Sequence, residues 1–266
     1  MRIANVLSGT LFALLVTSVD VNARPSISTA ILPGGVLRTV LPTDIRRSDV
    51  TVPKFRLARR PVTNAEFLAF VRKHADWRRG SAPEIFVDHG YVQHWRSALQ
   101  LGPGAKPNQP VTQVSWFAAQ AYCEGQGMRL PTWHEWEFAA AADEHARDAR
   151  DNPAWREKLL GWYSRPTDVT LRSVGMQAPN VYGVYDLHGL VWEWVEDFSA
   201  LMVSADNREQ GDPDLAKFCG AGALSVNDRE NYAVLMRVAL LSSLQAKYTT
   251  RNLGFRCAVD LQKTSK

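Results

Sequence analysis

Apolar residues recur at intervals of three and four in several segments of this chain, a spacing typical of amphipathic helices. In the first of these segments, Phe67, Phe70 and Val71 share one face and are expected to point inward. The pattern predicts four helices, at about Thr63–Lys73, Trp116–Gly125, Thr132–Ala146 and Asp228–Leu241.

Three of these helices have recognisable starts. Thr63-x-x-Glu66 and Thr132-x-x-Glu135 are capping boxes, in which the threonine hydroxyl accepts from the backbone N–H three residues on. The glutamate of each box reaches back to the threonine N–H. Ser115 directly precedes the second helix and is expected to cap it.

Strand signals are short and few. Val52–Leu57, Val191–Val195 and Phe255–Val259 are expected to be strands, whereas residues 76–112, 147–183 and 197–227 are rich in turn-forming residues. The chain therefore predicts an α+β fold with much irregular structure. Such a fold needs support beyond regular ladders, from aromatic rings, a disulfide or a metal ion.

The N-terminal segment resembles a secretory signal. Residues 1–23 combine Arg2, an apolar stretch from Leu7 to Val19, and Val21-Asn22-Ala23 as a cleavage site. An uncleaved anchor is the alternative. With cleavage, residues 24–261 form one domain, 262–266 a tail, and no membrane span remains. The expected location is the periplasm or the exterior, where disulfides are stable.

Composition narrows the functional classes. The 266 residues are 45% hydrophobic and 22% charged, which excludes a disordered chain and a multi-span membrane protein. The net charge of +4 is mild, and the basic residues have no aromatic register that would indicate nucleic-acid binding. Nine tryptophans suggest a core of large rings, and three cysteines allow at most one internal disulfide.

Four segments in a fixed order carry a resemblance: Arg59–Phe67, Pro110–Cys123 continuing into Gly127–Phe138, Pro179–Trp194, and Asn252–Cys257. The series resembles the formylglycine-generating enzyme family, also called the sulfatase-modifying-factor domain, over about residues 50–260. The resemblance implies a compact α+β fold related to C-type lectins and poor in regular secondary structure.

The resemblance also implies a structural calcium site in the third segment. The positions carried over are the Asp186 and Glu193 carboxylates and the carbonyls of Gly189 and Val191, all hard oxygen ligands that suit calcium. The sequence departs from the family at Leu190, where relatives usually have Asn. The alternative is that Glu193 pairs with a nearby arginine.

The fourth segment implies a disulfide. Its cysteine commonly bridges the one in the second segment, which predicts Cys123–Cys257 here; two buried free thiols are the alternative. Asn252 and Arg256 are expected to hold the core by hydrogen bonds.

The residues that carry the family's catalytic chemistry have no counterpart at the matching positions of this sequence. Formylglycine-generating enzymes use two cysteines that bind copper, since soft thiolates suit Cu(I). Counting back from Asn252 places that pair at Asp228 and Ala233, and counting forward places the first near Ser225. Cys219 alone cannot form a bis-thiolate site, so neither that copper site nor formylglycine formation is expected.

Three functions remain open. The first is an accessory or maturation factor for a periplasmic protein client, because the motifs of the chain also resemble the exported bacterial branch that includes the accessory protein found with copper nitrite reductases. The second is an oxidoreductase of altered chemistry that tailors a small molecule or protein, and the last is a formylglycine-generating oxidase. Candidate catalytic residues for altered chemistry are Cys219, Ser225, Asp228, Arg237 and His188.

Overall fold

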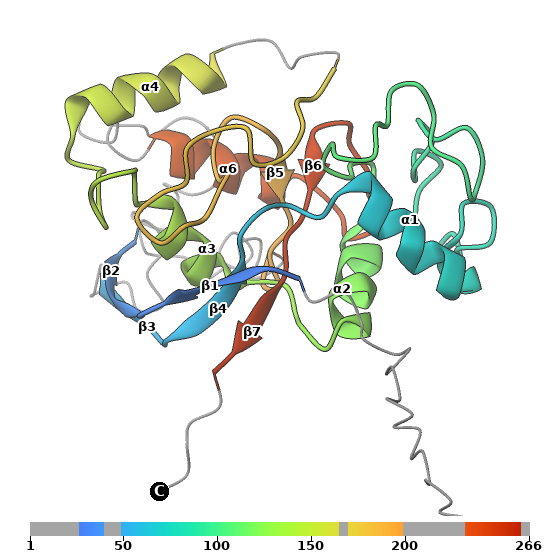
Figure 1. Ribbon diagram of the computed structural model, residues 1–266, viewed down its shortest axis with the longest axis horizontal. Helices are drawn as coiled ribbons and strands as arrows, with labels where there is room; N and C mark the ends of the chain where they lie inside the picture. Colours follow the sequence, from blue (N-terminus) through green and yellow to red (C-terminus); the bar gives the residue numbers. More distant parts are fainter. Residues whose placement is uncertain (1–26, 40–48, 165–169, 199–231, 262–266) are drawn as a thin grey trace, which may run out of the picture.

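The computed structural model describes residues 27–39, 49–164, 170–198 and 232–261 (Figure 1). The expected signal segment 1–23, the tail 262–266, and the candidates Cys219, Ser225 and Asp228 lie outside these residues. In the described part of the chain, no helix is both long and apolar enough to span a membrane.

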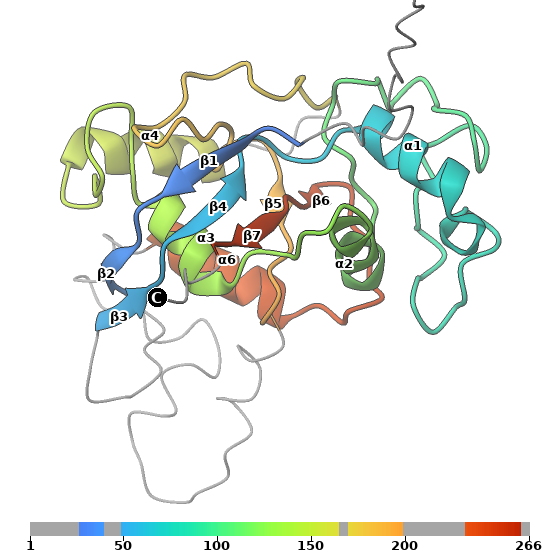
Figure 2. The same ribbon diagram turned by 60° about the horizontal axis from the view of Figure 1, so that its bottom comes forward.

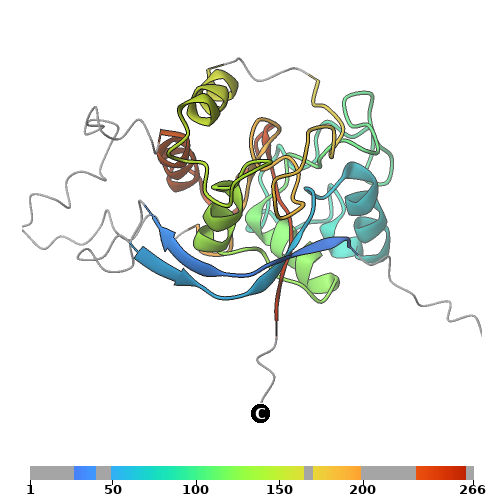
Figure 3. The ribbon, with the colours of Figure 1, turned by 60° about the vertical axis from the view of Figure 1, so that its left-hand side comes forward.

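A long bent ribbon of four short strands forms one side of the molecule: β1 (Thr29–Leu32), β2 (Gly35–Arg38), β3 (Asp49–Val52) and β4 (Phe55–Ala58). β1 pairs antiparallel with β4 and β2 with β3 in one continuous register, so the strands form a single curved ribbon in Figure 3. Gly34 sits at the bend with φ +71°, and a Cβ there would lie 2.4 Å from the Val52 carbonyl oxygen. The close approach of the strands therefore requires glycine.

Two further pairings complete the sheets. β7 (Ala258–Asp260) adds to β4, giving the strand order β1-β4-β7, and β5 (Trp192–Glu193) pairs in parallel with β6 (Leu253–Gly254). The expected strand Val52–Leu57 is divided between β3 and β4 by Pro53, which has no N–H for a ladder. The other two expected strands are real but shorter, or shifted toward the C-terminus.

The helices are α1 (Asn64–Lys73), the short 3-10 helix η1 (Ala75–Trp77), α2 (Trp116–Gly125), α3 (Trp133–Ala140), α4 (Pro153–Tyr163) and α6 (Tyr232–Ser242). Both predicted capping boxes and the Ser115 cap are confirmed. Local side-chain chemistry therefore sets the starts of α1, α2 and α3.

Two expectations about helices were wrong. α3 ends at Ala140 rather than near Ala146, because the Asp143 carboxylate accepts the N–H groups of His145 and Ala146 at 2.8 and 2.6 Å and forms a turn. The segment 147–183, expected to be irregular, contains α4. Its start has a legible signal, since Asn152 caps Ala154 N–H at 3.0 Å and Pro153 stands at the first helical position.

The core between these elements is built on aromatic rings and one disulfide. The Phe67 ring lies within 6.2 Å, centroid to centroid, of the rings of Phe70, Trp95, Tyr122 and Phe255. The Cys123–Cys257 bond, with a sulfur–sulfur distance of 2.02 Å, joins α2 to the residue before β7. The predicted disulfide is thus confirmed.

The arrangement of the elements creates a site between the helices. α4 packs against α6, and in Figures 1 and 3 α3 lies between these two helices and the β1–β4 ribbon. Figure 2 shows α1 and α2 together at the opposite end of the molecule from β2, β3 and α4. In Figure 1 the loop that leads from residue 170 to β5 passes below α4, and the Gly189 backbone lies against Trp162 of that helix.

Candidate functional site

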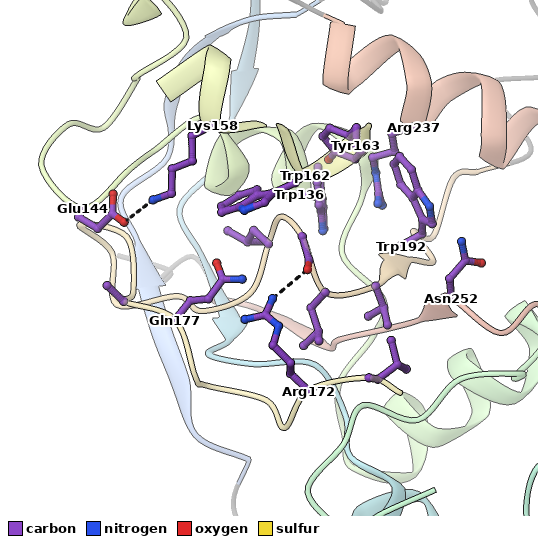
Figure 4. A pocket seen from close by; sticks show the side chains of 16 residues that line it. Trp136, Glu144, Lys158, Trp162, Tyr163, Arg172, Gln177, Trp192, Arg237 and Asn252 are labelled. Carbon is purple, nitrogen blue, oxygen red and sulfur yellow. Dashed lines mark hydrogen bonds and ion pairs between the residues drawn. The ribbon is translucent and has the colours of Figure 1, made fainter. Parts of the chain in front are cut away.

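A cleft of about 650 Å³ opens between α3, α4, the loop before β5, and α6 (Figure 4). Its aromatic wall consists of Trp136 from α3, Trp162 and Tyr163 from α4, and Trp192 from β5. The Tyr163 and Trp192 rings are stacked, with centroids 5.1 Å apart and planes 29° from parallel. The cleft therefore presents flat apolar surfaces that were joined from three separate segments of the chain.

The turn Asp186–Gly189 shapes one side of this cleft. Asp186 and Gly189 have positive φ values of 56° and 76°. A Cβ on Gly189 would lie 2.9 Å from Cδ2 of Trp162, so the indole rests directly on the glycine backbone. Glycine at this position therefore lets α4 approach the turn and sets the width of the cleft.

Three cationic side chains and one carboxylate line the cleft. Lys158 lies 5.3 Å from the Trp162 ring centroid and donates to the Glu144 carboxylate at 2.9 Å, so these two charges neutralise each other. Arg172 donates from Nη2 to the Gly189 carbonyl at 2.9 Å. Arg172 and Arg237 leave the cleft with a net positive charge.

Arg237 is the buried cation of the site. Its side chain is fully buried, and its guanidinium carbon lies 3.7 Å from the Trp136 ring centroid and 5.5 Å from that of Trp133. Nη2 donates to the Glu193 carbonyl, whereas Nε and Nη1 have no hydrogen-bond partner among the residues that the structure describes. Burial lowers the pKa of Arg237 to about 10, so the guanidinium is still charged at neutral pH.

His188 lies beside the cleft in an aromatic cage formed by Trp136, Trp155, Trp162 and Tyr163. Its Nε2 lies 2.8 Å from the Ala140 carbonyl, which can only accept, so this nitrogen carries the proton. Nδ1 then accepts from the Tyr163 hydroxyl at 3.2 Å. Both ring nitrogens are therefore used to hold the turn against α3 and α4.

Burial lowers the pKa of His188 to about 4, well below its ordinary value of about 6.5. At pH values between these two pKa values, His188 is protonated in the unfolded chain and neutral in the folded chain. The stability therefore falls as the pH is lowered through this window, and we expect His188 to account for a loss of about 1–2 kcal/mol between pH 7.5 and pH 5. Urea unfolding of the wild-type protein and His188→Gln at the two pH values measures this contribution.

The variant His89→Gln is the matched control, because His89 is exposed, and it should keep the wild-type pH dependence. His188→Gln should retain a weaker dependence, since burial also lowers the pKa of His94. An unchanged pH dependence in His188→Gln would contradict the assignment.

The four residues of the expected calcium site lie in and after this turn, where arginines already use two of them. Glu193 is fully buried, and its two carboxylate oxygens accept from Arg256 Nε and Nη2, both at 2.8 Å, while Trp136 Nε1 also donates at 2.8 Å. The Gly189 carbonyl accepts from Arg172. The alternative interpretation of Glu193, pairing with an arginine, thus matches the arrangement.

Asp186 supplies the one group here that a cation would satisfy. Its Oδ2 accepts from Gly175 N–H, whereas Oδ1 is buried and has no hydrogen-bond partner within the described part of the chain. Burial raises the pKa of this carboxyl group. No cluster of three or more His, Cys, Asp or Glu side chains suited to a metal lies within the described ranges. Calcium binding stays a prediction, and at the Gly189 carbonyl the ion would share the oxygen with Arg172 or displace it.

The structure brings together some of the expected site residues and adds others. Gly189, Val191 and Arg237 line the cleft, with His188 beside it. Sequence reasoning missed Trp162, Tyr163 and Arg172, because they lie in the segment that was expected to be irregular. Asn252 also lines the cleft, and its Oδ1 accepts from the Thr250 hydroxyl at 3.0 Å. Arg256 has the core hydrogen-bonding role that was expected for it.

Most of this chain is similar in sequence to known proteins. The profile of the Sulfatase-modifying factor enzyme 1-like domain matches residues 17–261. A formylglycine-generating enzyme of Streptomyces coelicolor is 30% identical, over 81% of this chain and 81% of that protein. An inactive C-alpha-formylglycine-generating enzyme 2 of Mus musculus is 30% identical, over 79% of this chain and 76% of that protein. Hercynine oxygenase of Mycolicibacterium thermoresistibile is 34% identical, over 54% of this chain and 36% of that protein.

Proposed function

Because this chain belongs to the sulfatase-modifying factor enzyme 1-like domain family, we propose that it keeps the family's fold without its formylglycine-generating chemistry. In this proposal the chain is an accessory or maturation factor for an exported protein, with copper proteins such as nitrite reductase as the first clients to test. Its relatives include both an active and an inactive formylglycine-generating enzyme, so membership alone does not decide the activity.

The Cys123–Cys257 disulfide is the observation that carries the proposal. The 266-residue sequence has three cysteines, and two of them form this bond. Cys219 is then the one cysteine outside the bond, and a site with two thiolates for Cu(I) cannot form from a single thiol. The disulfide and the expected signal segment both favour an oxidising compartment outside the cytoplasm.

The cleft supports a role in binding. Its stacked rings and its buried arginine offer recognition surfaces, whereas both nitrogens of the nearby His188 are committed to hydrogen bonds within the fold. With its pKa lowered to about 4 by burial, this imidazole is a weak general base at neutral pH. The chemistry around the cleft therefore favours holding a ligand over transforming it.

An oxidoreductase of altered chemistry is the second candidate, favoured by the likeness to hercynine oxygenase. Elemental analysis of protein purified from its native compartment, combined with oxygen uptake in the presence of candidate substrates, separates the two functions. A redox metal together with turnover would favour the oxidoreductase.

The proposed function is tested in the organism that encodes the chain. Deleting the gene is expected to lower the activity and the copper content of a periplasmic copper enzyme at least fivefold, and expression of the chain from a plasmid should restore both. The purified protein, loaded with copper and given a cysteine-bearing sulfatase peptide, should yield no formylglycine by mass spectrometry.

The formylglycine-generating enzyme of Streptomyces coelicolor is the positive control for the peptide assay. Copper-dependent conversion of the peptide by this chain would refute the loss of the family's chemistry. Unchanged activity and copper content in the deletion strain would refute the role in maturation of copper proteins.

A further inference from the structure

Arg237 is a buried cation that forms no ion pair with a carboxylate in the part of the chain that the structure describes. Among the described residues, its Nε and Nη1 have no hydrogen-bond partner, and Nη2 donates to a backbone carbonyl. Within the described ranges, no carboxylate lies within ion-pair distance of it. The Glu193 carboxylate on β5, one of the charges that favour the protonated form of Arg237, is already bound by Arg256 through both oxygens.

The burial of Arg237 lowers the stability of the fold unless an anion or another acceptor binds its free N–H groups. Burial of an unpaired charge is unfavourable, and buried N–H groups without acceptors add to that cost. An anion that accepts from Nε or Nη1 would remove both penalties. Arg237 lines the cleft, so a ligand in the cleft can supply that anion.

The aromatic side chains around Arg237 favour a flat ligand. The guanidinium lies 3.7 Å from the Trp136 ring centroid, and Figure 4 shows Arg237 reaching from α6 toward Trp136 and Trp192. The stacked pair of Tyr163 and Trp192 lies on the same side of the cleft. Aromatic side chains favour offset stacking or edge-to-face contact with another ring, and a cation beside them attracts an anionic group carried by that ring.

The remaining charges of the cleft also favour an anionic ligand. Lys158 is neutralised by Glu144, and the exposed guanidinium of Arg172 adds a second positive charge to that of the buried Arg237. A volume of about 650 Å³ accommodates a ligand of one or two fused rings, near the middle of the range for small-molecule sites.

We propose that the cleft binds a small planar aromatic carboxylate, with the carboxylate on Arg237 and the ring against Trp192 and its aromatic neighbours. This inference rests on the proposed function only in taking the cleft as a binding site. It adds the chemical class of the ligand.

The test uses two matched probes and isothermal titration calorimetry with the full chain. 2-Naphthoate and 2-naphthalenemethanol share the same rings and differ in the carboxylate. Naphthoate is expected to bind at least tenfold more tightly than the alcohol, because hydrogen bonds to charged groups are stronger than those between neutral groups. Equal affinities, or no binding of either probe, would overturn the proposal.

Two variants localise the effect. Arg237→Gln should weaken naphthoate binding at least tenfold and leave the alcohol within threefold of its wild-type affinity. Lys73→Gln, which removes an exposed cation from the last turn of α1, outside the residues that line the cleft, should change neither affinity by more than threefold. Retention of wild-type naphthoate affinity by Arg237→Gln would also overturn the proposal.

The folding of Arg237→Gln is checked by near-ultraviolet circular dichroism. If it is unfolded, Trp192→Leu replaces it and should weaken both probes at least fivefold; unchanged binding would place the ligand elsewhere. If neither probe binds but deletion of the gene still lowers the activity of the copper enzyme, the proposed ligand is wrong and the proposed function stands. If naphthoate binds tightly but the deletion has no effect on the copper enzyme, the proposed maturation role is wrong and the ligand proposal stands.

Discussion

Glu193→Gln is expected to lower the free energy of unfolding by about 3–5 kcal/mol, because it leaves the buried Arg256 guanidinium without its counter-ion. Both side chains are fully buried, and two hydrogen bonds of 2.8 Å join them. Glu193 also accepts from Trp136 Nε1, so the substitution weakens the connection between β5 and α3. Urea unfolding followed by tryptophan fluorescence measures the loss.

Glu144→Gln is the matched control, since it removes the same kind of group from an ion pair at the surface. The Lys158–Glu144 side chains are 47% and 34% exposed, and such pairs contribute about 0–1 kcal/mol. A loss below 1 kcal/mol in Glu193→Gln would contradict the central role of the buried pair.

Urea unfolding of the wild-type protein also tests the expected calcium site. If calcium binds at Asp186 and Glu193, the wild-type protein should be more stable in calcium than in a chelator. Equal stability in both would leave the pairing of Glu193 with Arg256 as the full role of that carboxylate.

The second large effect is expected from the disulfide. Replacing both Cys123 and Cys257 by Ala should lower the free energy of unfolding by about 2–5 kcal/mol, because the bond restricts the unfolded chain. The cysteines are 134 residues apart, and chain-entropy arithmetic for a loop of that length gives about 5 kcal/mol as the upper figure. Urea unfolding of the double variant in the absence of reductant measures this loss.

Cys219→Ser supplies the control, since this variant retains the bond. Its unfolding midpoint should fall on reduction by as much as that of the wild-type protein. A double alanine variant as stable as the oxidised wild-type protein would show that the bond contributes nothing to stability.

Local features of this protein were legible in its sequence. The starts of α1 and α3 follow from Thr63 and Thr132, because a capping box involves only residues three positions apart. Asn152 and Pro153 carry an equally local signal for α4, although the turn-forming residues around them obscured it. The Cys123–Cys257 bond was predicted by family resemblance, since nothing local relates two cysteines so far apart.

The sequence by itself thus determined the helix starts, the mixed α+β class and the family. Only the tertiary structure decided the cleft, because its parts come from α3, α4, the loop before β5, and α6. The partner of Glu193 is equally a tertiary matter: Arg256 lies 63 residues away, and a carboxylate in sequence is compatible with a metal or with an arginine until packing brings one of them close. Packing likewise left Arg237 charged, buried and short of acceptors beside Trp136, an arrangement that no spacing along the chain could indicate.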